Sequence, residues 1–217
     1  MEAVKNIWNG LDWSVLTDML LSCLPALICI TFHELAHGYI AWFLGDNTAK
    51  QMGRLTLNPI KHIDPMGLVA MLLFHFGWAK PVPVDMRNFK NPKSGMAVTA
   101  LAGPLANVLI TVIALFIYGL CYRVAGELVL KMIYLTAYTS IYFAIFNLMP
   151  IPPLDGSKIV FSFLSDEMYN KLMRYEKYGM IILVVLVAAD VLPLGKIAGL
   201  VFDKLFPIAE FAYGLTV

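Results

Sequence analysis

Charged residues are scarce in this chain. Only 14% of its 217 residues are Asp, Glu, Lys or Arg, and 59% are hydrophobic. Soluble domains average about 25% charged and about 45–50% apolar residues, so this composition excludes an ordinary soluble domain and indicates a protein dissolved in a lipid bilayer. The formal net charge is only +1, which gives no support to nucleic-acid binding.

Cysteines are also few, and no internal repeat divides the chain. Cys23 and Cys29 lie about 9 Å apart along one predicted helix, too far for a disulfide, and we interpret all three cysteines as packed thiols. The first apolar run has no small-x-small cleavage site, so we expect it to be retained. We predict a single integral-membrane domain over residues 1–217, with a catalytic core at about 13–165 and C-terminal helices at about 178–213.

Long apolar runs are what the sequence has in abundance. A transmembrane helix needs about 20 apolar residues, and four runs approach or exceed that length: residues 13–44, 96–122, 128–149 and 178–192. Pro25 leaves open whether the first run is one helix or two. We predict an all-α polytopic membrane protein, a bundle of about four to six transmembrane helices, with an apolar tail that lies at the interface or dips into the membrane.

Two connecting pieces have a different pattern. Residues 51–58 and 79–85 predict short strands, so we expect a short membrane-associated β-hairpin or sheet; prolines in the second piece would confine it to an edge. The apolar piece at residues 66–76 is too short to cross and predicts a re-entrant or interfacial segment.

Basic residues gather in the connections that follow the first and third runs. With four spans these connections share a side, which the positive-inside tendency makes cytoplasmic. They carry Lys50, Arg54, Lys61, Lys80, Arg87, Lys90, Lys93, Lys158, Lys171, Arg174 and Lys177. We therefore expect His33 and His37 toward the cytoplasmic end of the first span.

The pattern HELAH at residues 33–37 lies inside the first apolar run. Residues four apart on a helix share a face, so His33 and His37 can reach one ion. Zinc accepts imidazole nitrogens and acidifies a bound water, and Glu34 can take its proton. Two hydrogen-bonded structural histidines are the alternative, but ionisable residues inside a membrane are costly and indicate a functional site.

A catalytic zinc needs a third protein ligand and one open position. We expect His62 and His75 at the surface or the interface, and we interpret Cys29 as a packed thiol rather than a ligand. Asp155 is the preferred candidate, because prolines end the third run just before it and a glycine follows it. The alternative is a turn aspartate that caps the next helix.

Three segments together resemble the site-2 protease family of intramembrane zinc metalloproteases: HELAH at 33–37, GPLAN at 103–107 and NLMPIPPLDG at 147–156. The resemblance covers about residues 30–160 in the family's order. The chain is similar to the minimal members without a PDZ or CBS domain, which are mostly bacterial. This implies a multi-pass protein of a bacterial cytoplasmic membrane, with its active site toward the cytoplasm.

The resemblance also implies the chemistry. His33, His37 and Asp155 would hold one Zn²⁺, and Glu34 would be the general base. The reaction would be hydrolysis of peptide bonds in or near transmembrane segments, for regulated intramembrane proteolysis or clearance of membrane peptides. The partners would be a transmembrane peptide or membrane-protein substrate and the lipid bilayer.

Further residues are implied near the site. Asn107 is a candidate for holding substrate backbone or the oxyanion, and Asn147 is a second such candidate; the alternative for both is a helix–helix hydrogen bond. Residues 51–58 are the candidate edge for pairing with an unwound substrate.

Three rival functions remain at the level of sequence. A membrane metal-binding or transport protein could use the same ligands, but the later spans hold few further ionisable groups. An inactive relative would be expected to lack Glu34 or a ligand, and all are present. A zinc protease acting on prenylated peptides would take a different third ligand, for which no motif is evident.

Overall fold

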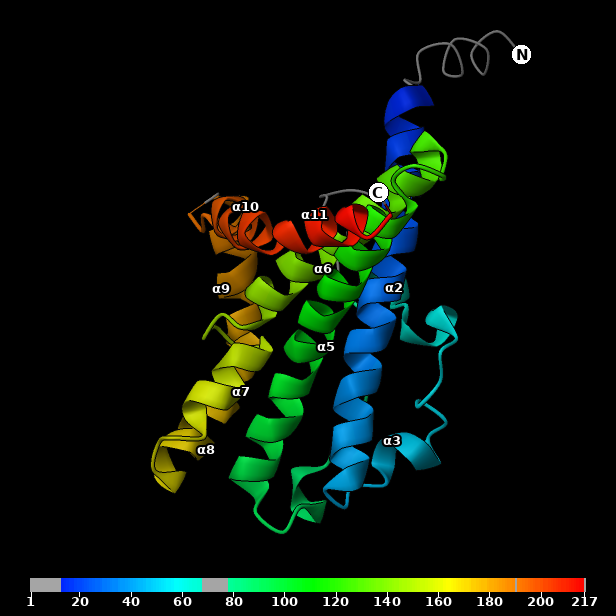
Figure 1. The fold of residues 1–217 in the computed structure, drawn as a ribbon. Helices are drawn as coiled ribbons and strands as arrows, with labels where there is room; N and C mark the ends of the chain where they lie inside the picture. The colour runs from blue at the N-terminus through cyan, green and yellow to red at the C-terminus, as the bar shows by residue number, and fades with distance from the viewer. Residues whose placement is uncertain (1–12, 68–77, 190, 217) are drawn as a thin grey trace, which may run out of the picture.

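The computed structural model describes residues 13–67, 78–189 and 191–216 of the chain. Three of the described helices are long and apolar enough to cross a membrane: α2 (Trp13–Phe43), α5 (Pro92–Cys121) and α6 (Glu127–Asn147). Each packs against the other two, and they run in alternating directions through the bundle (Figure 1). They correspond to the first three predicted spans, so the predicted helical membrane architecture is confirmed.

Prolines shape the long helices without ending them. Asn91 caps α5, since its side chain accepts a hydrogen bond from the Ser94 N–H, and Pro92 takes the first helical position. Pro25 lies inside α2 and Pro104 inside α5. Neighbouring helices and side chains make such interior prolines tolerable in membrane spans. The first predicted run is therefore one continuous helix.

The predicted fourth span forms α9 (Glu176–Ala188), whose 13 residues are fewer than the roughly 20 that a crossing helix needs. Among the described residues three helices meet that length, and the total of four to six spans stays a prediction. The tail forms α10 (Leu194–Leu205) and α11 (Pro207–Gly214). Both lie crosswise over one end of α5 and α6 (Figure 1).

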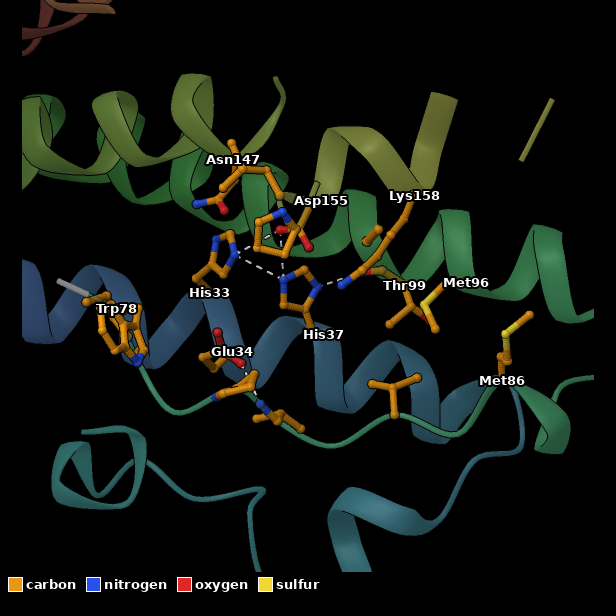
Figure 2. Close-up of a pocket in the computed structure, with 18 of the residues that line it drawn as sticks. His33, Glu34, His37, Trp78, Met86, Met96, Thr99, Asn147, Asp155 and Lys158 are labelled. Carbon is orange, nitrogen blue, oxygen red and sulfur yellow. Dashed lines mark hydrogen bonds and ion pairs between the residues drawn. The ribbon is translucent and has the colours of Figure 1, made fainter. Parts of the chain in front are cut away.

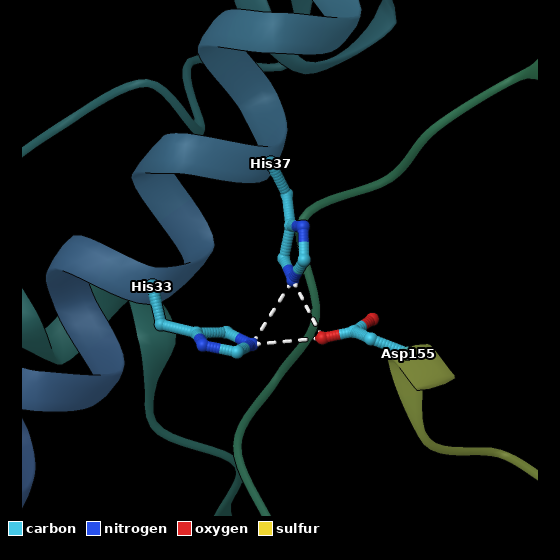
Figure 3. Close-up of side chains that lie close together, drawn as sticks. All are labelled: His33, His37 and Asp155. Carbon is cyan, nitrogen blue, oxygen red and sulfur yellow. Dashed lines mark hydrogen bonds and ion pairs between the residues drawn. The ribbon is translucent and has the colours of Figure 1, made fainter. Parts of the chain in front are cut away.

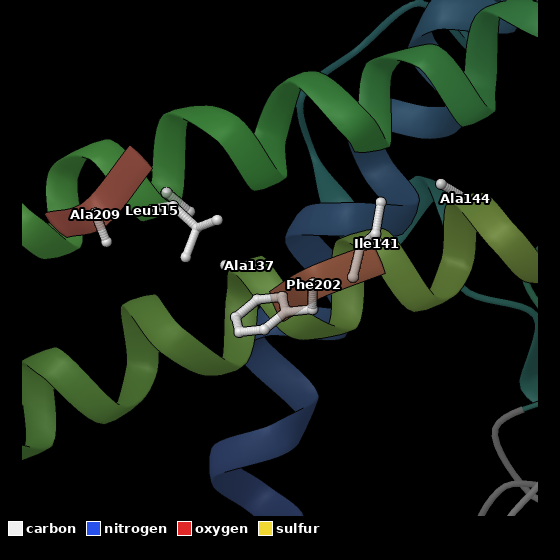
Figure 4. Close-up of a cluster of buried hydrophobic side chains, with 7 residues drawn as sticks. Leu115, Ala137, Ile141, Ala144, Phe202 and Ala209 are labelled. Atoms are coloured by element: carbon white, nitrogen blue, oxygen red, sulfur yellow. The ribbon is translucent and has the colours of Figure 1, made fainter. Parts of the chain in front are cut away.

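A cluster of buried apolar side chains joins the tail to the bundle. Small alanines let the helices approach closely, and the Phe202 ring of α10 packs edge-on against Tyr134 and Tyr138 of α6. Figure 4 shows the cluster, which consists of Ala114, Leu115, Ala137, Ile141, Ala144, Phe202 and Ala209. It joins α10 and α11 to α5 and α6.

The connection between α2 and α5 departs from the sequence prediction. It contains α3 (Thr48–Gln51) and two 3₁₀ helices, η1 (Pro59–His62) and η2 (Met86–Asn88). The predicted strand at 51–58 is wrong, because the chain leaves α3 there and turns at Gly53, which has a φ of +63°. The predicted re-entrant segment at 66–76 lies from residue 68 onward outside the described residues.

The second predicted strand, at 79–85, is also not formed. Its one β-type pairing within the described residues is an isolated antiparallel bridge between Ala79 and Ile63, earlier in the same connection. Pro81 and Pro83 have no N–H to donate, so a regular ladder cannot continue along this segment. The described residues contain no sheet.

Two short helices, α7 (Asp155–Phe161) and α8 (Asp166–Arg174), follow α6. Figure 1 shows α8 at the same end of the bundle as α3, while α10 and α11 lie at the other end. The two basic connections therefore share one end of the bundle, as the sequence predicted.

Candidate metal centre

Two imidazoles of α2 meet one turn apart. His33 and His37 lie on the same face of the helix, and their Nε2 atoms are 3.0 Å apart (Figure 3). The rings stand edge to face, with centroids separated by 4.6 Å. This is the arrangement that the spacing of four residues predicts.

The carboxylate of Asp155 joins these imidazoles from a distant part of the chain. Its Oδ2 atom lies 3.1 Å from Nε2 of His33 and 3.1 Å from Nε2 of His37 (Figure 3). Gly156 allows the tight fold that places it, because a Cβ there would lie 2.1 Å from the carbonyl oxygen of Leu148. The proline-rich break after α6 thus turns Asp155 inward instead of letting it serve only as a helix cap.

Helix α5 lies directly against this cluster. A Cβ on Gly103 would lie 2.5 Å from Nε2 of His37 and 2.6 Å from Nε2 of His33. The Nδ1–H of His37 donates to the carbonyl oxygen of Thr99, at 2.7 Å. Gly103 of the GPLAN segment is therefore required for steric reasons, since any side chain there would clash with the two imidazoles.

Glu34 faces the same space from α2 and is held by the main chain. Its Oε2 accepts a hydrogen bond of 2.7 Å from the N–H of Val82 (Figure 2). The buried Arg54 in turn donates to the carbonyl oxygens of Lys80 and Pro81, at 2.8 and 3.1 Å. Residues 80–82 are thus fixed beside the metal cluster from both sides.

A buried aspartate anchors the far end of this segment. The carboxylate of Asp46 accepts hydrogen bonds from the Asp85 N–H, from the Asn88 amide and from both the N–H and the hydroxyl of Thr48. Burial raises the pKa of Asp46, but these hydrogen bonds outweigh burial and hold the pKa below its ordinary value. Arg87 likewise lowers the pKa of Asp85 to about 2 through a side-chain hydrogen bond. Both carboxylates stay ionised at neutral pH.

The remaining sequence candidates lie elsewhere. The thiol of Cys29 points at the carbonyl oxygen of Thr136, 3.6 Å away, and not at the cluster. His62 was expected at the surface or the interface, and the surface position is wrong: the ring is buried and donates to the carbonyl oxygen of Thr56, at 2.9 Å. His75 lies outside the described residues.

The two asparagines occupy different places. Asn147 lines the cavity beside the cluster (Figure 2), and its amide nitrogen donates to the carbonyl oxygen of Phe143 in its own helix. Asn107 is fully buried in α5, does not line the cavity, and contacts the rear of the His33 ring.

The cluster fits a zinc ion. Ligand atoms about 2.0 Å from a tetrahedral ion lie about 3.3 Å from one another, and the three donor atoms here are separated by 3.0–3.1 Å. Two neutral imidazoles and one carboxylate are also a donor set that zinc accepts. Among the described residues this is the one group of three such side chains able to hold a metal ion.

The cluster opens into a cavity of about 1000 Å³. The cavity walls carry the three donors, Glu34 and mostly apolar side chains, including Ile30, Met96, Phe143 and Leu183. A fourth coordination position could therefore be reached by water or by a peptide. Nothing in the sequence indicated Val82 and Thr99, because the first contributes its main-chain N–H and the second its main-chain carbonyl, and every residue type other than proline has both groups.

Comparison with known proteins defines the class to which this site belongs. The chain is 40% identical over 177 residues to "Putative zinc metalloprotease YwhC" of Bacillus subtilis strain 168, covering 78% of this chain and 80% of that protein. The Rip2 proteins of Mycolicibacterium smegmatis and Mycobacterium tuberculosis strain H37Rv, which carry the same description, are 29% and 26% identical over 170 residues. Those matches cover 76% of this chain and 66% of each relative. No solved structure matches the chain significantly.

The protein is thus a zinc metalloprotease with several membrane-spanning helices. The family model of peptidase family M50 matches residues 122–189, a stretch that includes Asp155. The chain belongs to this family, the site-2 proteases, as the sequence motifs predicted.

Proposed function

We propose that this metalloprotease hydrolyses peptide bonds in or near transmembrane segments of membrane-protein substrates. His33, His37 and Asp155 would hold one Zn²⁺, and Glu34 would act as the general base. The observation that carries the proposal is that all four side chains line one cavity whose other walls are largely apolar and come from the helices of the bundle and from residues 78–87 of the α2–α5 connection. Such a cavity can admit a hydrophobic peptide and still give water access to the ion.

The chain's own groups have separable tasks in this reaction. Zinc, when bound, supplies a Lewis acid for the scissile carbonyl and acidifies the attacking water. The Val82 N–H fixes Oε2 of Glu34, and Oε1 makes no hydrogen bond within the described residues, so it can take the proton. The same carboxyl can then deliver that proton to the leaving amine. Asn147, on the cavity wall, can donate to or accept from substrate backbone.

A substrate helix must unwind before cleavage, and each exposed backbone group then needs a partner in the membrane. Residues 51–58 were expected to supply such partners, but none of them lines the cavity. Residues 82–84 are the better candidate. The N–H of Val84 has no partner within the described residues, and Val84 lines the same cavity, two residues after the Val82 that holds Glu34. We therefore assign substrate pairing to this segment.

Replacing Val84 with proline removes this N–H. We expect kcat/KM for a transmembrane peptide to fall about five- to tenfold, the equivalent of one main-chain hydrogen bond, with unchanged zinc content. Val84→Ala is the matched control, because it shortens the side chain but keeps the amide. Equal cleavage by the proline and alanine variants would exclude the pairing.

The same end of the bundle carries α3, α8 and the basic connections, and the C-terminal half of α2 with its histidines points toward it (Figure 1). The positive-inside tendency favours a cytoplasmic location for this end. We propose a bacterial cytoplasmic membrane with the active site opening toward the cytoplasm.

The function is tested by zinc analysis and cleavage on the same purified protein in lipid vesicles. We expect one zinc per chain, cleavage of a model transmembrane peptide, loss of cleavage on chelation, and recovery on adding zinc. A water-soluble peptide with the same central sequence serves as the control and should be cut much more slowly. Metal uptake into the vesicles without any peptide cleavage would instead establish the metal-transport alternative.

A further inference from the structure

Asn107 stands behind the metal cluster. Its side chain is 0% exposed and is absent from the cavity wall, so it cannot touch a peptide in the cavity. Its amide nitrogen lies 3.3 Å from Nδ1 of His33, and its amide oxygen has no hydrogen-bond partner in the described part of the chain. The main-chain carbonyl of Asn107 is held separately by the hydroxyls of Thr111 and Ser140, at 3.0 and 2.8 Å.

The tautomer of His33 decides which amide atom belongs beside it. Nε2 of His33 faces Asp155 and His37, so this is the nitrogen that would bind the ion. A neutral imidazole that binds through Nε2 carries its proton on Nδ1 and needs an acceptor there. The nitrogen and oxygen of an amide exchange places by a half-turn. That half-turn brings the unpartnered oxygen of Asn107 onto the Nδ1–H of His33.

His37 shows the same arrangement made by the main chain. Its Nδ1–H donates to the carbonyl oxygen of Thr99, which lies about one helical turn before Gly103 in α5. Both histidines thus turn a rear nitrogen toward α5, and both need an oxygen from that helix. Metal-ligating histidines generally have such a partner, which fixes ring orientation and tautomer.

We infer that Asn107 is a positioning residue: its amide oxygen accepts the Nδ1–H of His33 and so presents Nε2 to the zinc ion. The inference rests on the proposed function for the identity of the ligands. It replaces the substrate or oxyanion role that the sequence motif suggested for Asn107.

Two variants of Asn107 separate positioning from packing. Asn107→Asp keeps an acceptor oxygen but adds a buried charge, whereas Asn107→Leu keeps the volume but has no acceptor. If Asn107 positions His33, zinc affinity measured by chelator competition falls about 10- to 100-fold in the leucine variant and stays within a few-fold of wild type in the aspartate variant. If Asn107 only packs, the leucine variant keeps the zinc affinity of wild type and the aspartate variant, with its buried charge, loses it. That result would overturn the inference.

Ser140→Ala is the matched control, since it removes a hydrogen bond to the main chain of Asn107 and leaves the amide side chain in place. Its zinc affinity should equal that of wild type. The melting midpoint of each zinc-free variant is compared first, and Asn107→Ala replaces the leucine variant if that one does not fold. Unchanged zinc affinity with reduced kcat in the variant lacking the acceptor would return Asn107 to a substrate role. Wild-type protein that binds no zinc would refute the proposed ligands themselves. That outcome is distinct from failure of the Asn107 inference, in which wild-type protein binds zinc and the leucine variant binds it equally well.

Discussion

We expect the Glu34→Gln enzyme to keep its zinc and to lose peptide cleavage by about 10²- to 10⁴-fold, the usual contribution of a general base. Glutamine preserves the shape of the side chain, and its amide oxygen can still accept the Val82 N–H that holds Glu34 in place. Only the capacity to take a proton is lost. Cleavage rate and bound zinc are measured on the same preparation.

Glu127→Gln is the matched control for this change. Glu127 is exposed at the start of α6, at the end of the bundle away from α3 and α8, so its amide should leave both zinc and cleavage unaffected. Full activity of Glu34→Gln would assign the base to another group. Loss of zinc together with activity would instead mean that Glu34 supports the metal cluster.

The Asp155→Asn variant should lose zinc affinity by more than about 100-fold, beyond the 10- to 100-fold that removal of an outer hydrogen-bond partner costs. The change removes the one negative charge among the three donors, and a neutral amide oxygen is a much weaker zinc ligand than a carboxylate. Cleavage should fall in parallel and recover partly at high zinc concentration. Competition with a chromophoric chelator measures the affinity.

Asp166→Asn provides the comparison for Asp155. Its carboxylate is 85% exposed and pairs with Lys93 at the surface, where ion pairs contribute little. We expect its zinc affinity to match that of wild type. If Asp155→Asn bound zinc as tightly as Asp166→Asn, Asp155 would only be hydrogen-bonded to the two imidazoles in Figure 3, and the third ligand would have to be sought elsewhere.

Several features were predictable because they depend on local spacing. Four-residue spacing places His33 and His37 on one helix face wherever that helix lies. The length of apolar runs predicts α2, α5 and α6, because lipid permits few other structures. The break after α6 was also visible as a cluster of prolines, and it drew attention to Asp155.

The predictions that were wrong concern the α2–α5 connection. The apolar residues Met52, Leu55 and Leu57 suggested a strand at 51–58, but the chain there is held by single tertiary contacts, such as Arg54 to the carbonyls of residues 80 and 81. His62 was expected at the surface or the interface because it lies in a connection between spans, and its ring is instead buried and donates to the carbonyl of Thr56. Short-range pattern could not foresee these long-range partners.

By itself the sequence determined the helical membrane architecture, the shared face of the two histidines and the family of the protein. Only the tertiary structure decided how near α5 comes to α2, which main-chain groups meet Glu34 and His37, and whether an asparagine faces the cavity or the back of an imidazole. Helical periodicity fixes the direction in which each side chain points around the axis of its own helix. The distance and rotation between two axes depend on packing across the whole interface, where a position without a side chain, such as Gly103, matters as much as any ligand.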